Sequence, residues 1–363
     1  MGFDSDKAHR GRGHKNVAPD MDHTLHWTLD QRIYAPYKIA TLAQVTAEAG
    51  IAIDVVLAGT GLCAAQLSDP QIKTSVRQLV TASRNVMQAG APADTGMVAG
   101  SRMNISSYGM YGYALLCCAT LRDVTQLAVK YHRLATPTVG MSFREEDGEA
   151  VWSFDSIVGL DVDDPLYRFF VEFQFGIHTT LGKDLMGPVF KLARVRARYA
   201  APADRSPYRH HLRCKAEFDQ PVNELRFAAE LLDQCPTYHN PITVAMVSEV
   251  CERLLDEARR DAGVGAQVSR LLMEVPGRFD DMETLARKLN TTSRTLRRRL
   301  HLEGTSYQDL LAEVRCHLAK EYLRSTRMTT EDIAETLGFS DAANFRHAFR
   351  RWTGRNPSDF RRV

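Results

Sequence analysis

Hydrophobic residues recur at helical spacing over several stretches of the chain. Between residues 71 and 89 the apolar positions are three and four residues apart, which predicts one amphipathic helix. The stretch 109–133 predicts two consecutive helices with a break near 118–121. Another helix is predicted to begin at Pro165 and to run to about Leu181. The carboxylates of 161–164 favour a helix N-terminus, and proline fits the first turn.

Apolar and polar residues alternate over shorter stretches, which predicts a small sheet in the same region. The runs 138–143 and 150–154 predict a hairpin whose strands are joined by a longer polar loop, 144–148. Residues 191–199 predict a strand with one face in water, and 223–228 predict another strand. This part of the chain therefore predicts an α+β domain with a sheet after its leading helices.

The pattern divides the chain into four segments. Residues 1–26 are polar and predict a flexible arm, and residues 27–240 form the predicted α+β domain. Residues 241–265 predict a helical linker, with a helix to about Arg260 that Gly263 and Gly265 interrupt. Residues 266–363 predict only helices and short turns, so the second domain is predicted to be all-α.

The all-α segment contains a helix, a tight turn and a second helix between about residues 282 and 302. Leu285 and Leu289 mark the apolar face of the first helix, and Thr292 or Ser293 is a suitable N-cap for the second. Leu296 lies on the buried side of that second helix, whose opposite side is rich in arginine. This combination is typical of a helix-turn-helix unit.

A second unit of the same kind follows at about residues 330–352. Leu289 and Leu337 are 48 residues apart, and Ser340 corresponds to Thr292 as the predicted N-cap. A helix from about Tyr307 to Leu323 is predicted to join the two units. Ordinary amphipathic helices with solvated arginines would explain one such pattern, but two in tandem favour a DNA-binding domain.

Charge is divided unevenly between the two predicted domains, although the whole chain of 363 residues has a net charge of only +2. Residues 266–363 carry 18 Lys and Arg against 13 Asp and Glu, and the rest of the chain is slightly acidic. A basic C-terminal domain favours nucleic acid as its partner. No stretch is apolar enough to predict a membrane span, and residues 1–20 lack the apolar core of a secretory signal.

Candidate chemistry is sparse elsewhere in the sequence. The seven cysteines include no CxxC pair, so they predict reduced thiols in a cytoplasmic protein. The histidines lack the spacing of a zinc site, and the acidic run 161–164 is explained by a helix start. There is no GxGxxG, P-loop, GxSxG or HExxH motif. The sequence therefore predicts no enzyme, no metal site and no cofactor.

The C-terminal segment resembles the DNA-binding domain of the AraC/XylS family of bacterial transcription regulators. The resemblance is carried by the residues 285–300, 303–307, 333–345, 348–354 and 357–361. Residues 105–134 also resemble the non-cupin, arabinose-binding-like sensor domain of a subgroup that includes regulators of ornithine utilisation. Together the two resemblances cover nearly all of the chain after its first 30 or so residues.

The resemblance implies how the protein would work. The second helix of each unit would enter successive major grooves of double-stranded DNA. Alanine at 342 and 343 departs from the polar residues often found there, which favours methyl contact or close approach over hydrogen bonding. Carried over by position, the residues expected to contact DNA are Arg294, Arg297, Arg298, Ala342, Ala343, Asn344, Arg346 and His347.

The resemblance also implies a small-molecule effector of unknown identity, a homodimer and RNA polymerase as a partner, with activation as the usual outcome. The side chains that would bind the effector are not predicted. Five aromatic residues are candidates to line its pocket, although packing in the core is the expectation for each: Tyr108, Tyr111, Tyr113, Trp152 and Phe154.

Three other functions stay open on the sequence alone. A repressor or dual regulator would have the same architecture, because the outcome depends on where the protein binds relative to a promoter. An enzyme with a helix-turn-helix tail would need a catalytic constellation in residues 30–240, and none is found. A DNA-binding architectural protein would respond to no metabolite.

Overall fold

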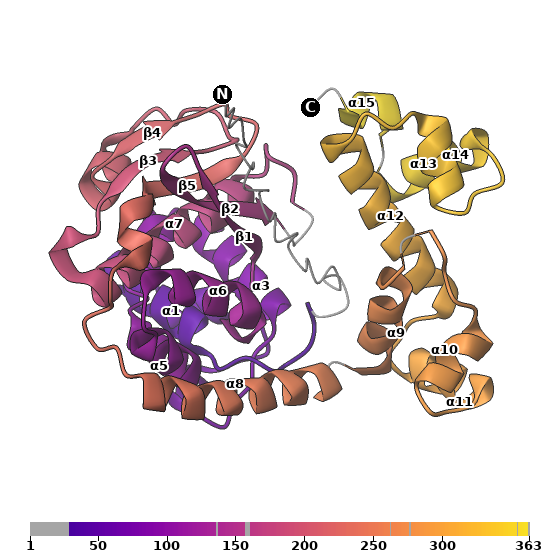
Figure 1. The fold of residues 1–363 in the computed structure, drawn as a ribbon, viewed down its shortest axis with the longest axis horizontal. Helices are drawn as coiled ribbons and strands as arrows, with labels where there is room; N and C mark the ends of the chain where they lie inside the picture. Colours follow the sequence, from indigo (N-terminus) through magenta and orange to yellow (C-terminus); the bar gives the residue numbers. More distant parts are fainter. Residues whose placement is uncertain are drawn as a thin grey trace, which may run out of the picture.

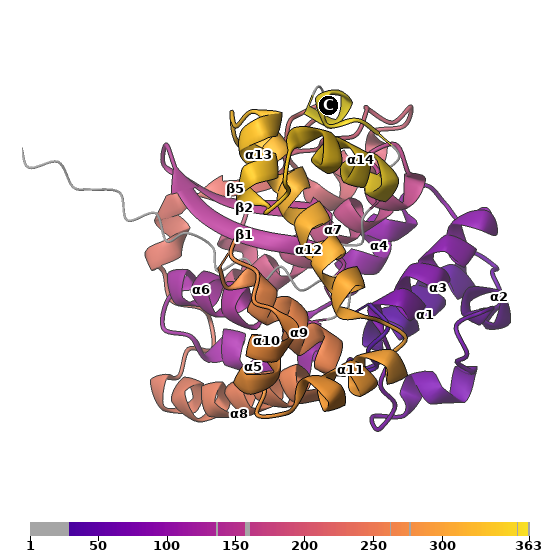
Figure 2. The same cartoon turned by 90° about the vertical axis from the view of Figure 1, so that its right-hand side faces the viewer.

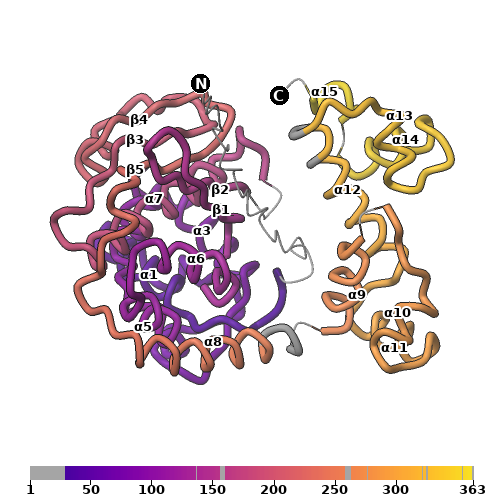
Figure 3. Tube along the Cα trace, in the orientation of Figure 1, coloured from indigo at the N-terminus to yellow at the C-terminus, as the bar shows by residue number. Residues whose placement is uncertain are grey.

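The computed structural model describes residues 29–135, 137–156, 160–261, 263–275, 277–353 and 355–361. The predicted arm, 1–26, lies outside these ranges. The described chain forms an N-terminal mixed α/β domain and a C-terminal helical domain (Figures 1 and 3). Each domain has its own hydrophobic core, and the change from one core to the other falls between Leu255 and Val264.

Eight α-helices and five strands are assigned within the described part of the N-terminal domain. The helices are α1 (Tyr37–Glu48), α2 (Ile53–Leu57), α3 (Val76–Gln88), α4 (Thr95–Ser101), α5 (Gly109–Cys117), α6 (Leu121–Tyr131), α7 (Pro165–Met186) and α8 (Pro241–Asp261). The strands are β1 (Val139–Glu146), β2 (Glu149–Ser156), β3 (Leu192–Arg196), β4 (Lys215–Glu217) and β5 (Asn223–Ala228). The two predicted helices within 109–133 are thus confirmed as α5 and α6.

The strands form one sheet in the order β1-β2-β5-β3-β4, in which only β3 and β4 pair in parallel. The predicted hairpin is confirmed, but the longer polar loop is wrong. Its strands continue to Glu146 and Glu149, and the turn consists of Asp147 and Gly148 alone. Both turn residues have positive φ, 52° and 78°, as the tight turn that suits twisted hairpin strands requires.

One face of the sheet packs on the apolar core, where Trp152, Phe154 and Phe227 are buried. The other face of the sheet carries charged side chains. Their alternation with apolar residues is the reason that the sequence predicts a strand with one face in water. These charged side chains form a network in which the nearly buried Arg226 bonds Glu224 at 2.8 Å and Glu149 at 3.0 Å. Paired charges therefore cover this face in place of a second apolar layer.

Helix α7 crosses the middle of the domain and runs beyond the predicted end at Leu181, to Met186. The Asp164 side chain caps it by accepting a 2.9 Å hydrogen bond from the Leu166 amide. Its central Gly176 lets the backbone of α4 come very close, because an added Cβ would lie 2.5 Å from the Met97 carbonyl oxygen. This close crossing fixes α7 between α4 and the sheet.

Helix α8 packs on the N-terminal domain through Val247, Cys251 and Leu255, and it leads toward the C-terminal domain (Figure 1). The prediction that Gly265 interrupts the helical structure is wrong, because α9 (Gly263–Met273) begins at Gly263 and includes Gly265. The remaining helices of the C-terminal domain are α10 (Met282–Lys288), α11 (Ser293–Leu302), α12 (Tyr307–Ser325), α13 (Thr330–Thr336), α14 (Ala342–Thr353) and α15 (Pro357–Arg361).

Candidate nucleic-acid interface and interior cavity

The first helix-turn-helix unit consists of α10 and α11. Asp281 caps α10 through a 2.8 Å hydrogen bond from the Thr284 amide. In the turn, Asn290 has a φ of 51°, a left-handed conformation that asparagine tolerates well. Thr292 then caps α11 by accepting from the Thr295 amide at 3.2 Å, which confirms the predicted N-cap.

The second unit consists of α13 and α14, with Gly338 at a φ of 70° in the turn. The predicted N-cap, Ser340, is wrong. Asp341 caps α14 instead, since its Oδ1 accepts from the Asn344 amide at 2.7 Å. The Ser340 hydroxyl lies one residue too early for this bond and accepts from the Asn344 side chain.

The arginines predicted to contact DNA in the first unit all lie on the exposed side of α11. Leu296 and Leu300 bury the opposite side, and Arg294, Arg297 and Arg298 are exposed. Within the described chain, no ion pair engages these three guanidinium groups. They are therefore available to an external anion.

The residues of the second unit that are predicted to contact DNA differ in their exposure and in their hydrogen bonds. Ala343 and His347 are exposed on α14, and Ala342 is half-buried. The Asn344 amide nitrogen Nδ2 lies 2.8 Å from both Ser340 Oγ and Asp341 Oδ2, so this side chain is held in the turn. Arg346 is exposed and lies 3.7 Å from a carboxylate oxygen of Glu331.

Helix α12 joins the two units, which lie toward opposite ends of it (Figures 1 and 2). Its 19 residues give a length of roughly 28 Å at 1.5 Å per residue. The buried side chains of α12, among them Leu310 and Leu318, belong to the same core as both units. The helix therefore sets a fixed distance between α11 and α14.

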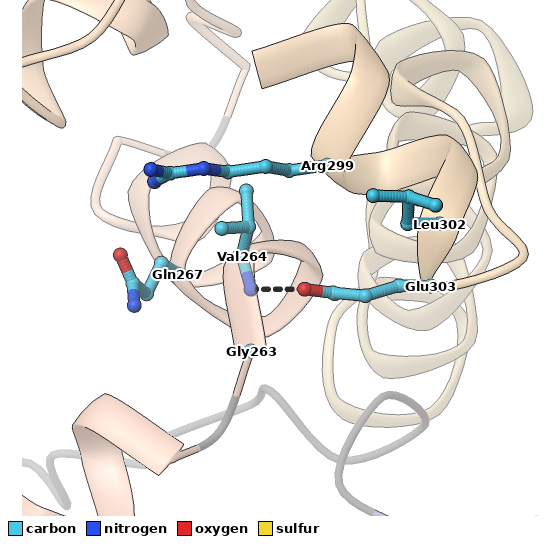
Figure 4. Close-up of a pocket in the computed structure, with 6 residues that line it drawn as sticks. All are labelled: Gly263, Val264, Gln267, Arg299, Leu302 and Glu303. Atoms are coloured by element: carbon cyan, nitrogen blue, oxygen red, sulfur yellow. Dashed lines mark hydrogen bonds between the residues drawn. The ribbon is translucent and has the colours of Figure 1, made fainter. Parts of the chain in front are cut away.

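Glu303 fastens α9 to the first unit (Figure 4). Its carboxylate follows the end of α11 and accepts from the amides of Val264 and Gly265 at 2.7 and 2.8 Å. These amides are at the N-terminus of α9, where a negative charge is favourable. Gly263 has a φ of 72°, and an added Cβ would lie 3.0 Å from the same carboxylate.

The N-terminal domain encloses a cavity of about 60 Å³ between α5, α6, α7 and the sheet. Tyr108, Tyr111 and Trp152, three of the five aromatic candidates, line it. Tyr113 is 48 % exposed on the surface instead, and Phe154 is buried in the core without lining the cavity.

Three of the polar residues that line the cavity are basic. Lys38 of α1, His132 and His178 line it, and no aspartate or glutamate is among its described lining residues. Burial lowers the pKa of Lys38 to about 7, that of His132 to about 4 and that of His178 to about 3. The pKa values of the two histidines are lowered further by Lys38, because neighbouring like charges disfavour protonation.

Sequence reasoning did not find these three basic residues. Lys38 lies within an apolar stretch, where a lysine is expected to extend to the surface. His132 and His178 come from separate elements, and only the packing of α7 on β1 brings His178 Nε2 to 3.1 Å from Met141 Sδ. No local spacing in the sequence signals such an arrangement.

Among the described residues, no cluster of His, Cys, Asp or Glu is arranged to bind a metal ion. All seven cysteines are free thiols, and burial raises the pKa of Cys118 to about 12, which disfavours a reactive thiolate. None of the described helices is both long and apolar enough to span a membrane.

Comparisons with known proteins agree with this architecture. Residues 50–235 match the model of the arabinose-binding domain of AraC transcription regulators, and residues 285–363 match a helix-turn-helix domain. The chain is 38 % identical to the ornithine utilization regulator of Pseudomonas aeruginosa, over 75 % of this chain and 79 % of the relative. It is 31 % identical to an uncharacterised HTH-type transcriptional regulator of Mycobacterium tuberculosis, over 90 % and 95 %.

Among solved structures, the transcriptional regulator CdpR from Pseudomonas aeruginosa matches 90 % of this chain and 98 % of its own, with a TM-score of 0.47 and 24 % identity. The named relatives are transcription regulators and not enzymes. The chain therefore belongs to the AraC family of DNA-binding transcription regulators, with the arabinose-binding type of N-terminal domain.

Proposed function

We propose that the protein is a transcriptional activator that a small-molecule effector controls from the cavity of the N-terminal domain. One observation carries the proposal: the same chain presents unpaired arginines on a helix-turn-helix unit and encloses a cavity with polar groups. A cavity lined by apolar groups and a few polar ones is the usual form of a small-molecule site. The protein would act in the cytoplasm with RNA polymerase as its partner.

The DNA contacts of this proposal divide into two kinds. In the first unit, Arg294, Arg297 and Arg298 contact bases or phosphates, since arginine is the commonest partner of guanine in the major groove. In the second unit, Ala343 supplies close approach or contact with a thymine methyl group. Arg346 and His347 supply polar contacts there, whereas Asn344 and Ala342 mainly shape the start of α14.

Helix α8 provides a route from the cavity to the DNA-binding domain. Tyr111 lines the cavity and lies beside Cys251 of α8. The Asn240 amide at the start of α8 donates to the Cys117 carbonyl of α5 at 2.9 Å. An effector that displaces Tyr111 would therefore shift α8, which leads directly toward α9.

The proposed homodimer is supported by apolar side chains that α5 and α8 leave in water. Ile242 and Met246 of α8 are 75 % and 65 % exposed, and Met110 and Tyr113 of α5 are 41 % and 48 % exposed. The two helices pack on one another, so these four residues belong to neighbouring surfaces. A second copy of the chain would remove them from water.

Sedimentation velocity of the full chain tests this interface. Met246→Glu should shift the protein from dimer to monomer, because the new carboxylate would be buried in the contact. Val55→Glu, at a residue 43 % exposed on α2, is the matched control and should leave the dimer unchanged. Loss of the dimer in both variants, or in neither, would contradict the proposed surface.

Two measurements test the function as a whole. Selection from random and genomic DNA should yield a specific site, and transcription with purified RNA polymerase should rise when the protein occupies it. Ornithine is one compound to test as an effector, because the name of a relative refers to its utilisation. Reduced transcription would identify a repressor, and no response to any metabolite would argue against effector control.

A further inference from the structure

The cavity in the N-terminal domain contains one side chain that can pair with an anion near neutral pH, the ammonium group of Lys38. His132 and His178 also line it but are neutral, with His132 Nε2 2.7 Å from the Val139 carbonyl oxygen and His178 Nδ1 3.2 Å from the Gln174 carbonyl oxygen. No acidic side chain lines the cavity within the described chain. A ligand with an ammonium group would have no acidic side chain to pair with in this lining. A ligand with a carboxylate could pair with the ammonium group of Lys38.

Tyr108 adds an unused polar group to the same cavity. Its side chain is 92 % buried, and its hydroxyl has no hydrogen-bond partner in the described chain. Buried hydroxyls are rarely left unpaired, because the lost hydrogen bond to water is costly. Other polar residues of the lining are already engaged, as Tyr111 donates to the Ala128 carbonyl and Thr125 to the Arg122 carbonyl.

The size of the cavity limits the ligand. The cavity volume is about 60 Å³, which favours a small ligand. Most of the remaining lining is apolar, with Leu121, Ile177 and Leu181 among the side chains. The site therefore suits a short organic acid with an apolar body.

We propose that the cavity binds a small organic carboxylate, whose anionic group contacts Lys38 and Tyr108. This inference rests on the proposed effector control and specifies the chemical class of the effector. It disfavours ornithine as the occupant, because two ammonium groups would be buried beside Lys38 with only the carboxylate of ornithine itself to balance them.

Protonation of Lys38 on binding of a carboxylate can be measured, and a purely structural role of Lys38 would not produce it. Burial lowers the pKa of this lysine to about 7, and a neighbouring carboxylate would raise it again. His132 and His178 stay neutral from pH 6 to 9, and burial raises the pKa values of Tyr108 and Tyr111. Binding should therefore take up a proton, and the affinity should fall as the pH rises from 7 to 9.

Calorimetry and thermal unfolding of the full chain test the proposal with acetate, propionate, butyrate and lactate. At least one acid should bind and raise the melting temperature, while butyramide, butylamine and ornithine should not. Titration in buffers with different ionisation enthalpies should reveal the proton uptake. Failure of all four acids, or equal binding of butyramide and butyrate, would overturn the proposal.

Three variants complete the test. Tyr108→Phe removes one hydroxyl and should weaken binding of the acid about tenfold or more, because a hydrogen bond to a charged group is lost. Lys38→Met should abolish both binding and proton uptake, whereas Lys73→Met, at an exposed lysine, should change neither. Unchanged affinity in the first two variants would contradict the assignment.

Operator binding with and without the acid separates this inference from the proposed function. If an acid binds but leaves the DNA affinity and transcription unchanged, the carboxylate site is supported and effector control is wrong. If ornithine changes DNA binding while no acid binds, effector control is supported and the carboxylate assignment is wrong.

Discussion

Arg298 lies on the exposed side of α11 without an ion-pair partner in the described chain. Arg298→Ala should lower the affinity for the selected DNA site by about 1–3 kcal/mol and relax the preference at one base pair. Fluorescence anisotropy with single-base variants of the site measures both effects. Arg32→Ala removes an exposed arginine from the N-terminal domain and should have no effect. A uniform loss over all sequences would instead identify Arg298 as a phosphate contact.

The buried histidines at the cavity make the free energy of unfolding depend on pH. This dependence begins near pH 6.5, at a higher pH than the range in which carboxylates titrate. His178 has a pKa of about 3 in the fold and about 6.5 when unfolded. Below pH 6.5 the unfolded chain binds the extra proton, so the free energy of unfolding decreases as the pH falls. The loss should approach about 1.4 kcal/mol per pH unit and per buried histidine.

Urea unfolding between pH 7.5 and 5 measures this dependence. His178→Gln should flatten the profile, because the titrating group is removed. His239→Gln, at an exposed histidine, should leave the slope unchanged. A profile equally steep in the His178 variant would show that other groups bind the proton on unfolding.

At the scale of elements, Glu303 shows how one side chain joins two helices. Glu303→Ala leaves two amides at the N-terminus of α9 without their acceptor, so the C-terminal domain should lose about 1–2 kcal/mol of stability. Glu303→Gln should lose less, since its amide oxygen still accepts. Thermal unfolding measures the loss, and Glu335→Ala, at an exposed glutamate of α13, should show none.

Periodicity predicted the elements that bury one face, and it failed where packing determines the structure. Strand β5 was predicted at its observed bounds, because Leu225 and Phe227 alternate with charged neighbours. Strand β4 has only three residues, too few to show alternation, and its pairing with β3 determines it. Helices α9 and α15 were not predicted as separate elements, since each depends on contacts with α12.

The candidate sites were predictable to very different degrees. Residues on α11 and α14 share one helix face each, so spacing alone indicates the DNA-facing side. The cavity collects residues from α1, α5, α6, α7 and the sheet, and tertiary packing alone brings them together. The N-cap of α14 was predictable only in part. Both residue types cap helices, and only the backbone geometry shows that Asp341 and not Ser340 is the cap.

At the scale of the whole molecule, the length of α12 predicts the spacing between the two segments of the DNA site. We expect a rigid helix of roughly 28 Å to hold α11 and α14 in successive major grooves, about one turn of DNA apart, on one face of the duplex. Inserting five base pairs between the two segments of a protomer's site should abolish the contribution of α14, because the second groove then faces away.

An insertion of ten base pairs restores the rotation but doubles the distance, and a rigid α12 cannot extend to it. The affinity should therefore stay as low as with five base pairs, as measured by anisotropy on otherwise identical duplexes. A flexible connection would recover affinity with ten base pairs, which would contradict a fixed spacing. Arg346→Ala supplies the control, since it should weaken binding to the native spacing and leave binding to both inserted sites unchanged.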